Sequence, residues 1–417
     1  MQAVILAAGR SSRFWPLNQC HKSLIKVMGR PLIWHTIEGL RKTGISEIII
    51  IQGTKAVEEE LKKYKIKAKI KYVVQKEPKG TGDAISQARE FIKGPFVVVG
   101  PHKVDLENYL PQLLEKFKKN KGKIILTGVK TDRPWDFGIF KLKGDKVLGI
   151  VEKPKKGKEP SDIKTTETYI FPQKFFDYYE KTTKKEEDLI DTINLFVKDN
   201  GAEFVLLKGE TASLKYPWDL FGIAKILFDS KGFKNKIASS AIIGKNVIIE
   251  KNVYIGENTK ILENTIIRGP SYIGNNCVIG NNSVVRGYTN LEDGILLGAL
   301  AEIKNSIVQE GSHFHSGYIG DSIFGENCRT GAGIITGNRR IDRHNIKAKV
   351  KGKKIDTGLT FFGVVAGDNT RFGVRVSPMP GTLIGSNSII GPGTLVFENI
   401  GDNMVFYARQ EIVKKRA

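Results

Sequence analysis

Hydrophobic residues recur at every sixth position through the first part of the C-terminal half. Aliphatic residues keep this phase from Ile237 to Ile303, and glycine or another small or polar residue often follows them. A helix repeats at 3.6 residues and a strand at two, so this period fits neither. It predicts a hexapeptide β-helix, in which each six-residue rung forms one side of a prism and its aliphatic side chain points inward. The twelve positions are Ile237, Ile243, Ile249, Ile255, Ile261, Ile267, Ile273, Ile279, Val285, Leu291, Leu297 and Ile303.

The repeat continues, with interruptions, toward the C-terminus. Its phase breaks near Gln309, a second register covers 324–336, and the repeat returns at 366–396. Between these registers lies an excursion rich in Arg and Lys. Inserts usually leave a solenoid at one corner and often carry binding function. The predicted boundaries are a linker at 229–236, a β-helix at 237–401 with its excursion at 338–362, and a tail at 402–417.

Residues 1–228 show a different pattern, in which short apolar runs alternate with amphipathic segments. This alternation predicts a parallel sheet with helices on both faces. Ligands of such sheets bind at the carboxyl ends of the strands. The predicted strands are 3–6, 47–51, 70–74 and 96–99, and the predicted helices are 31–42, 56–63 and 83–92.

The first strand end carries a loop that suits a phosphate. Ala8 and Gly9 are small enough for the backbone to approach a ligand, and consecutive N–H groups can cradle an anion. Arg13 and Lys22 would add positive charge against a triphosphate. A glycine-containing turn alone is a weak signal, so the prediction depends on the motifs that follow.

Composition and charge narrow the function classes. The chain has 417 residues, of which 40% are hydrophobic and 26% charged, as in a globular protein of two or three domains. The net charge of +22 is spread over helices and loops without a basic–aromatic motif. This distribution favours a solvated Lys-rich surface or phosphorylated substrates, and we expect no nucleic-acid partner.

The cysteines and the apolar runs indicate the compartment. Cys20, Cys277 and Cys328 lie far apart with no CxxC spacing, which suits a reducing cytosol. The N-terminal MQAVILAAGR has no basic leader and is interpreted as a first strand. No apolar run approaches membrane-spanning length, so we expect a cytoplasmic protein with no membrane partner.

Five ordered motifs resemble those of sugar-1-phosphate nucleotidylyltransferases. LAAGRSSRFWPL with HKSL is similar to the family's glycine-rich signature, although Ser11 replaces a glycine and His21 a proline. The resemblance implies a Rossmann-like nucleotidyltransferase domain over 1–228. The implied catalytic residues of this half are Arg13 and Lys22 in the signature. Its implied binding residues are Ala8 and Gly9 in the signature, Gln75, Gly80 and Thr81 in the base-recognition segment, and Gly138 and Glu152 in the sugar-recognition segments; Pro217-Trp218-Asp219-Leu220 resembles the closing segment.

The resemblance also implies a reaction. In the family a sugar-1-phosphate attacks the α-phosphate of a nucleoside triphosphate, pyrophosphate leaves, and carboxylates hold Mg²⁺. Pro101 and Ser213 stand at the two implied aspartate positions, so no metal is expected there, and Asp105 is the nearest candidate carboxylate. Lys103 lies beside the first of these positions. The replacements leave open whether this half transfers a nucleotide or only binds a nucleoside triphosphate or nucleotide sugar.

A second reactive constellation lies where the six-residue phase breaks. The run from His313 to Asp321 resembles the acetyltransferase half of bifunctional N-acetylglucosamine-1-phosphate uridylyltransferase / glucosamine-1-phosphate N-acetyltransferases, especially archaeal ones. The spacing His-x-x-Tyr-x-Gly-Asp implies that His315, not His313, is the catalytic base. A neutral imidazole can take the proton of an amine that attacks a thioester. Tyr318 shares this segment, and Asn338 could stabilise the oxyanion.

Further expectations come from the same resemblance. Arg286 and Lys304 would hold the sugar phosphate, and acetyl-CoA would be the co-substrate, bound between left-handed β-helices of a homotrimer. Phe361 replaces a lysine of the family pattern. The leading hypothesis is therefore a sugar-nucleotide biosynthesis transferase with two active sites. The alternative is a catalytically reduced nucleotide-sugar-binding regulatory protein, or the partner of an active paralogue.

Overall fold

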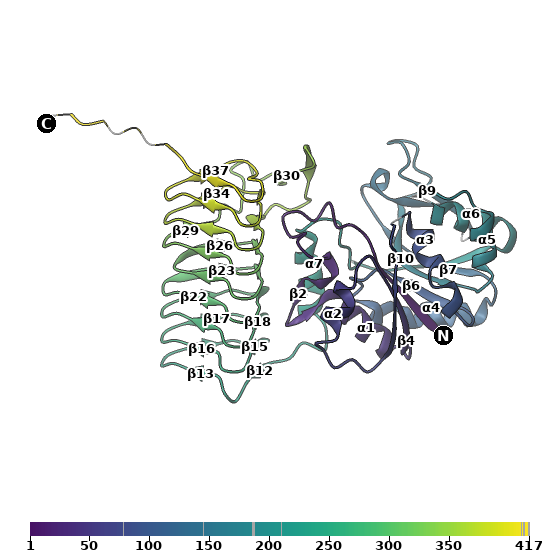
Figure 1. Ribbon diagram of the computed structural model, residues 1–417, viewed down its shortest axis with the longest axis horizontal. Coiled ribbons are helices and arrows are strands. Elements are labelled where there is room, and N and C mark those ends of the chain that lie inside the picture. Colours follow the sequence, from purple (N-terminus) through teal and green to yellow (C-terminus); the bar gives the residue numbers. More distant parts are fainter. Residues whose placement is uncertain are drawn as a thin grey trace. The chain divides into compact units, whose positions relative to one another are not determined.

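The computed structural model describes residues 1–77, 79–144, 146–185, 188–209, 211–409, 411 and 413–415. The chain divides into two compact units, shown in Figure 1. The first comprises Met1–Arg10 and Pro31–Ser213, and the second comprises Ser11–Arg30 and Leu214–Ala417. This grouping places an N-terminal segment together with the C-terminal half, whereas the domain limits given above remain predictions from sequence.

A nine-stranded sheet forms the first unit, in the order β11-β7-β10-β6-β1-β4-β5, with β8 and β9 off this path. β1 lies between β4 and β6 and is parallel to both. The strands are β1 (Gln2–Ala7), β4 (Glu47–Gln52), β5 (Lys69–Val74), β6 (Phe96–Val99), β7 (Ile124–Lys130), β8 (Gly138–Lys143), β9 (Lys146–Glu152), β10 (Ile163–Phe171) and β11 (Ala202–Leu206).

The four strands predicted to form a parallel sheet do so, since β1 pairs in parallel with β4 and β6, and β4 with β5; a strand outside that set differs. β10 runs antiparallel to both β6 and β7. The chain between β7 and β10 forms the antiparallel hairpin β8–β9 and contains no crossover helix. A parallel return would need such a crossover, so β10 enters the sheet in the opposite direction.

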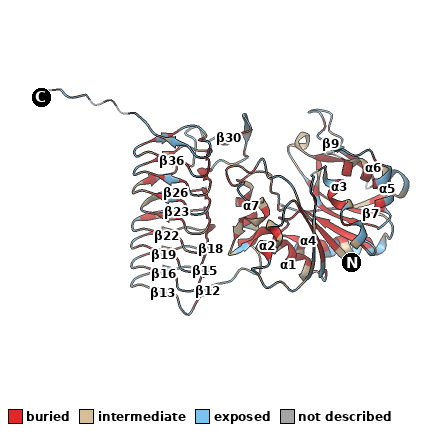
Figure 2. Cartoon of the chain, viewed as in Figure 1, coloured by how far each residue is buried: buried red, intermediate tan, exposed pale blue. Residues whose placement is uncertain are grey.

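Two groups of helices accompany this sheet. α1 (Leu32–Lys42) packs against α4 (Leu106–Lys119), whereas α3 (Thr81–Ser86), α5 (Phe175–Lys181) and α6 (Asp188–Asn200) contact one another. Figure 2 shows the buried residues concentrated along the strands of the sheet. Helix α3 is shorter than the predicted 83–92, because a separate 3-10 turn, η2 (Arg89–Phe91), follows it. The other elements of this unit are β3 (Arg30–Pro31), which begins at its border, α2 (Ala56–Leu61) and η3 (Pro134–Asp136).

The second unit is dominated by a β-helix whose coils stack in parallel (Figure 1). Ile255 pairs with Ile273, eighteen residues further on, so three six-residue sides complete one coil. The nine in-phase aliphatics from Ile255 to Ile303 are fully buried in one continuous core. The predicted hexapeptide solenoid is confirmed over this range.

Three long sheets form the sides of the prism. The first contains β12 (Lys236–Ile237), β15 (Val253–Ile255), β18 (Ser271–Ile273), β21 (Thr289–Leu291), β24 (Ile307–Val308), β27 (Ile323–Phe324), β32 (Val364–Ala366) and β35 (Thr382–Ile384). The second contains β13 (Ile242–Ile243), β16 (Lys260–Ile261), β19 (Val278–Ile279), β22 (Leu296–Leu297), β25 (His313–Phe314), β28 (Arg329–Thr330), β33 (Arg371–Phe372), β36 (Ile389–Ile390) and β38 (Val405–Phe406). The third contains β14 (Ile248–Ile249), β17 (Ile266–Ile267), β20 (Val284–Val285), β23 (Ala301–Lys304), β26 (Gly317–Gly320) and β29 (Ile334–Ile335), and β34 (Ser377–Pro378) pairs with β37 (Leu395–Val396).

The two ends of the aliphatic repeat differ from the prediction. Ile237 and Ile243 are 49% and 39% exposed, because they belong to the terminal coil and no further coil covers them. The phase change begins before Gln309. Ile303 and Val308 are both fully buried although only five residues separate them, so this side of the coil has lost one residue.

The excursion leaves the coil after Asn338 and returns at Phe362, whose N–H donates to the Asn338 carbonyl oxygen at 2.9 Å. Within it, β30 (Lys347–Val350) and β31 (Lys353–Asp356) form an antiparallel hairpin. Residues 410, 412, 416 and 417 of the predicted tail lie outside the described part of the chain. No helix among the described residues has the length and apolar character needed to cross a bilayer.

Candidate functional site

Several predicted nucleotide-binding residues gather at one edge of the first unit's sheet. Ala8 and Gly9 follow β1, and Gly9 is exposed. Gly53 follows the adjacent β4, and a Cβ on it would lie 3.2 Å from the Ala8 carbonyl oxygen. Gln75 follows β5, and its N–H donates to the Gln52 carbonyl oxygen at 2.9 Å. Three neighbouring strands thus place these residues at their carboxyl ends, where α/β sheets bind ligands.

Hydrogen bonds from buried side chains hold the base-recognition segment in place. Gly80 has φ +136° and precedes α3, whose first residue, Thr81, is exposed. The buried Gln75 side chain donates to Asp83 at 2.6 Å. The buried Asp188 accepts hydrogen bonds from the Gly82 N–H, which fixes the first turn of the helix.

Gly138 and Glu152 are paired across the β8–β9 hairpin. A Cβ on Gly138 would lie 2.8 Å from a Glu152 carboxylate oxygen, so the glycine makes room for that side chain. An open surface pocket of about 590 Å³ adjoins this hairpin, lined by Lys130, Thr131, Asp132, Arg133, Phe137 and Lys164.

Arg13 and Lys22 belong to the second unit. Arg13 is exposed. The Lys22 side chain donates to the Leu214 carbonyl oxygen at 2.6 Å, and its backbone N–H donates to the Ser11 hydroxyl. His21 caps the 3-10 turn η1 (Lys22–Leu24), where the Ser23 N–H donates to its Nδ1. Burial, reinforced by the charge of Lys22, lowers the pKa of His21 to about 4, so the imidazole is neutral at physiological pH.

The residues at the implied metal positions do not fit a divalent cation. Pro101 and Ser213 offer no carboxylate. Asp105 is buried, and one of its oxygens accepts the Ala212 N–H at 2.9 Å. Lys103 is also buried and donates to the Ala212 carbonyl oxygen at 2.7 Å. An ammonium at this place repels Mg²⁺, which prefers several oxygen ligands in octahedral geometry.

No other group in the described ranges replaces the missing ligands. Clusters of three or more His, Cys, Asp or Glu side chains suited to a metal are absent from that part of the chain. Asp105 is the predicted candidate ligand; its Oδ2 accepts the Ala212 N–H, and its Oδ1 is buried without a hydrogen-bond partner, so a single carboxylate oxygen is left where Mg²⁺ needs several. We therefore assign no step to a metal ion in this half.

A charged network occupies one corner of the β-helix. Asp321 is 2% exposed and accepts from Lys304 at 3.0 Å, from Asn305 at 2.7 Å and from Asn338 at 2.6 Å. The Asn338 amide also lies 3.0 Å from the Tyr318 hydroxyl oxygen, to which it donates. The network joins residues of three successive coils, so it holds three predicted acetyl-transfer residues, Lys304, Tyr318 and Asn338, in one arrangement.

Gly320 allows this corner to close. A Cβ at this position would lie 2.5 Å from the Tyr318 hydroxyl and 2.6 Å from the Asn338 amide. Phe361, which stands in place of the family's lysine, packs beside the same network. The Lys304 ammonium and the Arg339 guanidinium each lie 4.6 Å from the centre of its ring. Phe361 therefore holds two cations by cation–π contacts where the family pattern has a cation of its own.

Arg286 and His315 stand apart from these hydrogen bonds. Arg286 pairs with Glu302 at 2.8 Å, and Glu302 lies opposite Tyr318 in the parallel register of β23 and β26. His315 is exposed directly after β25, and no hydrogen bond or ion pair of its imidazole is found among the described residues. His313, by contrast, lies 2.9 Å from Arg329. Burial and that guanidinium lower the pKa of His313.

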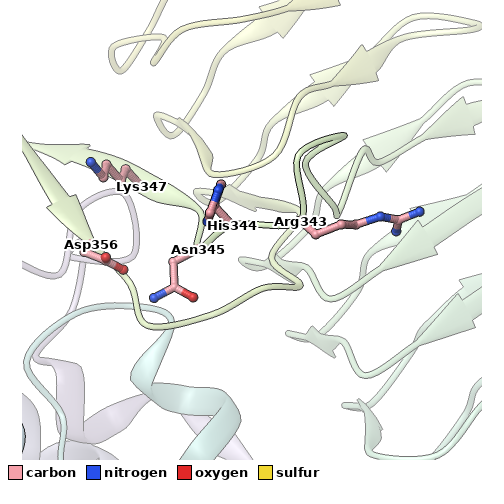
Figure 3. Close-up of a pocket in the computed structure, with 5 residues that line it drawn as sticks. All are labelled: Arg343, His344, Asn345, Lys347 and Asp356. Carbon is pink, nitrogen blue, oxygen red and sulfur yellow. The ribbon is translucent and has the colours of Figure 1, made fainter.

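The excursion carries a cavity of its own. It measures about 440 Å³ and is lined by Arg343, His344, Asn345, Lys347 and Asp356. Figure 3 shows His344 and Asn345 on the irregular segment that leads into the hairpin, with the Arg343 side chain directed away from Lys347 and Asp356. The Arg343 and Lys347 side chains therefore do not point toward one common ligand position.

Sequence reasoning did not single out Asn305, Asp321 or Arg339 as site residues. Asp321 was noted only as part of a motif, and its burial with three donors is a property of the stacked coils. Asn305 and Asp321 both have positive φ, at +42° and +50°, which marks them as turn residues beside the shortened side. An Asn or Asp at each corner of a β-helix is common in this chain, so the sequence alone gave no reason to prefer these two.

The chain was compared with known protein families and proteins. Residues 2–220 match the nucleotidyl transferase family, residues 252–287 match the bacterial transferase hexapeptide repeat, and residues 363–398 match the hexapeptide repeat of succinyl-transferase. A bifunctional protein GlmU from Methanocaldococcus jannaschii is 32% identical over 424 residues, with full coverage of both chains. The chain belongs to the family of bifunctional sugar-1-phosphate nucleotidylyltransferase/acetyltransferases.

Other relatives agree with this family. A bifunctional sugar-1-phosphate nucleotidylyltransferase/acetyltransferase from Sulfurisphaera tokodaii is 34% identical over 96% of this chain and 98% of its own length. Among solved structures, UDP-glucose pyrophosphorylase complexed with UDP-glucose is 21% identical, with a TM-score of 0.49 over 54% of this chain and 98% of that chain. The full-length relatives and the matched families confirm the resemblance and the fold class inferred from sequence, and hexapeptide repeats of this family are consistent with a left-handed β-helix. The individual site residues remain predictions.

Proposed function

We propose that the β-helix transfers an acetyl group from acetyl-CoA to the amine of an amino-sugar-1-phosphate. The observation that carries this proposal is the Asp321 network, which holds Lys304, Asn338 and Tyr318 in one arrangement. Cationic side chains suit a sugar phosphate, and amide and hydroxyl groups suit its sugar and the thioester oxygen. Whole-family membership supports the pairing of these two substrates.

The proposed step balances as follows. The amine nitrogen attacks the thioester carbon, the C–N bond forms and His315 takes the proton from nitrogen. The C–S bond breaks as the tetrahedral intermediate collapses, and the CoA sulfur leaves as a thiol with the proton that His315 took from nitrogen. Both N–H groups of the Asn338 amide are engaged, one with Asp321 and one with Tyr318. To donate toward the carbonyl oxygen while it is negative, Asn338 exchanges its bond to Tyr318 for one to the substrate, while Asp321 keeps the amide oriented.

The active form is proposed to be a homotrimer of β-helices. The sheet that carries Tyr318 presents exposed apolar side chains on its outer column, including Ile248 at 56% and Ile335 at 53%. Exposed aliphatics on a solenoid side suit contact with identical copies. Acetyl-CoA would bind between neighbouring prisms, next to His315. Sedimentation equilibrium of the full chain measures the trimer, and a monomer at assay concentration would contradict it.

For the first unit we propose binding of a nucleoside triphosphate or nucleotide sugar together with a sugar-1-phosphate. The strand-end residues Ala8, Gly9 and Gln75 support this, as does family membership. A second candidate function, binding without transfer, is favoured specifically by Lys103, which occupies the place between Pro101 and Ser213. In that case the first unit would sense nucleotide sugars or accompany an active paralogue.

Two assays on the purified full chain test these proposals. Thiol release from acetyl-CoA with glucosamine-1-phosphate measures the acetyl-transfer half. Pyrophosphate release from UTP or dTTP with a sugar-1-phosphate measures the nucleotidyl half. Nucleotide-sugar binding without pyrophosphate release supports the second candidate for the first unit. Absence of thiol release with every amino-sugar phosphate would contradict the acetyltransferase proposal.

A further inference from the structure

The segment 11–30, which carries Arg13 and Lys22, is attached to the β-helix at both of its ends. Near its start, the Lys351 ammonium donates to the Ser12 hydroxyl at 2.9 Å and the Trp15 indole donates to Asp402 at 3.2 Å. Near its end, the strands β2 (Lys26–Val27) and β3 (Arg30–Pro31) form a tight hairpin. This hairpin contacts three successive coils.

Buried side chains of the β-helix receive the backbone of that hairpin. The Met28 N–H donates to Asn290 at 2.8 Å, and the Gly29 N–H donates to Glu292 at 2.9 Å. The Asn290 amide in turn donates to the other Glu292 oxygen at 2.7 Å. Asn290 and Glu292 are both fully buried. Polar groups at this depth are costly unless they are satisfied, so these two side chains are matched to the hairpin backbone.

The next coil repeats this arrangement with Gln309. Its amide oxygen accepts the Lys26 N–H at 3.1 Å, and its amide nitrogen donates to the Lys26 carbonyl oxygen at 3.0 Å. The Lys26 ammonium pairs with Glu310 at 2.6 Å. The Gln309 side chain thus binds both the N–H and the carbonyl oxygen of Lys26. These two bonds fix the position of the hairpin along the solenoid and its distance from the solenoid surface.

The preceding coil limits how the turn can be built. Gly29 has φ +72°, and a Cβ there would lie 2.5 Å from the Tyr272 hydroxyl. Any other L-residue would be strained and would also push the hairpin away from the coil. The hairpin is therefore defined by Tyr272, Asn290 with Glu292, and Gln309, which lie on consecutive strands β18, β21 and β24 of one sheet.

We propose that Glu292, together with Asn290 and Gln309, positions segment 11–30 on the solenoid, and with it the predicted phosphate ligands Arg13 and Lys22. Lys22 lies four residues before Lys26, and its backbone is tied to Ser11 at the other end of the same segment. Releasing the hairpin therefore loosens Lys22 and Arg13 together. This inference rests on the proposed role of those two residues as phosphate ligands.

The test compares variants of the full chain in nucleotide binding and in acetyl transfer. Glu292→Gln cannot accept from both the Gly29 N–H and the Asn290 amide, because its own amide nitrogen must face one of them. Gly29→Ala reaches the same hairpin from the other side. Glu263→Gln is the matched control, since Glu263 also accepts from an asparagine, Asn281, but on an exposed part of the solenoid.

We expect Glu292→Gln and Gly29→Ala each to weaken nucleotide affinity about tenfold, the equivalent of one or two hydrogen bonds. Acetyl-transfer kcat and its KM for the amino-sugar phosphate should remain at the wild-type values, as should every parameter of Glu263→Gln. Gln309→Ala removes fewer contacts from buried groups, so it should weaken nucleotide affinity less than the other two variants and should likewise leave acetyl transfer unchanged. Wild-type nucleotide affinity in all three hairpin variants would overturn the proposal, as would parallel losses in both activities.

Hydrogen exchange separates this inference from the proposed function itself. If the wild-type chain binds no nucleotide, the nucleotide role of Arg13 and Lys22 fails, but the positioning claim is still measurable. Faster exchange of the Leu24 amide, which donates to the His21 carbonyl oxygen, in Glu292→Gln than in Glu263→Gln would support it. Equal exchange in the two variants would overturn it.

Discussion

The Lys103 ammonium donates a 2.7 Å hydrogen bond to the carbonyl oxygen of Ala212. The buried Asp105 accepts the N–H of the same residue, so both backbone groups of Ala212 are bound by side chains from one segment. These are the two segments in which the family resemblance places magnesium ligands. A fixed cation and a backbone bridge stand there instead, which ties the segments together without a metal.

The first prediction concerns divalent cations. Because Lys103 supplies positive charge at this place, nucleotide affinity of the wild-type chain should change less than about twofold between excess EDTA and millimolar Mg²⁺, apart from the effect of Mg²⁺ on the free nucleotide. Isothermal titration with a nucleoside diphosphate sugar measures this. An affinity that requires Mg²⁺ would show that carboxylates elsewhere assemble a metal site.

Lys103→Met provides the corresponding variant. It removes the buried ammonium and leaves the Ala212 carbonyl oxygen without that donor, so the free energy of unfolding should fall by about 1–3 kcal/mol. Nucleotide affinity should fall as well. Lys119→Met, at the exposed end of α4 where Lys119 pairs with Glu115, is the control and should match the wild type in both measurements. Equal stability and equal nucleotide affinity of the two variants would contradict the proposed role of Lys103 in nucleotide binding.

The next prediction concerns Asp321. Replacing it with Asn turns an acceptor of three hydrogen bonds into a group whose amide nitrogen faces a donor, and it leaves Lys304 without its counter-ion. Breaking such a pair costs about 3 kcal/mol of unfolding free energy. The KM for the amino-sugar phosphate should rise more than the KM for acetyl-CoA, since Lys304 is the side chain released.

Asp342→Asn is the control for this measurement. Like Asp321, Asp342 forms an ion pair, but its partner is Arg340 and the pair lies on the exposed excursion. Steady-state kinetics with each substrate varied in turn, together with urea unfolding, gives both quantities. If Asp321→Asn and Asp342→Asn behave alike, the network is dispensable for substrate binding.

A pH dependence follows from Glu292. Burial raises its pKa to about 7, and the carboxylates of Asp293 and Glu310 add to this effect. Glu310 is itself paired with Lys26. Since the folded pKa exceeds the unfolded value of 4.5, the folded state binds more protons between those pH values. The contribution of this group to stability is therefore present below about pH 4.5 and is lost as pH rises through about 7.

Thermal or urea unfolding of the wild type and of Glu292→Gln measures this dependence. The stability of the wild type relative to the variant should decrease between pH 5 and pH 8 by an amount on the order of 3 kcal/mol. Because both proteins share all other titrating groups, the contributions of those groups cancel in the difference between the two free energies of unfolding. A difference that is constant with pH, or that grows as pH rises, would contradict the assigned direction.

The solenoid was predictable from sequence because a buried residue recurs at a constant interval. From Ile255 to Ile303 each aliphatic stacks on copies in neighbouring coils, so period and burial coincide. The same rule failed at Ile237 and Ile243, because these residues lie in the first coil of the solenoid and no preceding coil covers them. The phase break predicted near Gln309 corresponds to the five-residue step from Ile303 to Val308, because a side shortened by one residue puts a polar residue at the expected aliphatic position.

The contacts between distant segments could not be predicted in this way. Asn290, Glu292 and Gln309 occupy polar positions that are ordinarily exposed on a β-helix, and only the hairpin at Gly29 explains their burial. Lys103 likewise looked like a surface lysine beside a missing ligand. Its role depends on Ala212, more than a hundred residues away, and pairings at that separation leave no periodic signal.

The most direct test of the account is acetyl transfer by the full chain and by His315→Ala. With acetyl-CoA and glucosamine-1-phosphate at saturating concentrations, loss of the general base should lower kcat about 10²–10⁴-fold. His313→Ala, two residues away, should retain activity within about threefold, because its imidazole faces Arg329. Wild-type turnover by His315→Ala, or loss of turnover in His313→Ala alone, would contradict the assignment of the base and with it the proposed site.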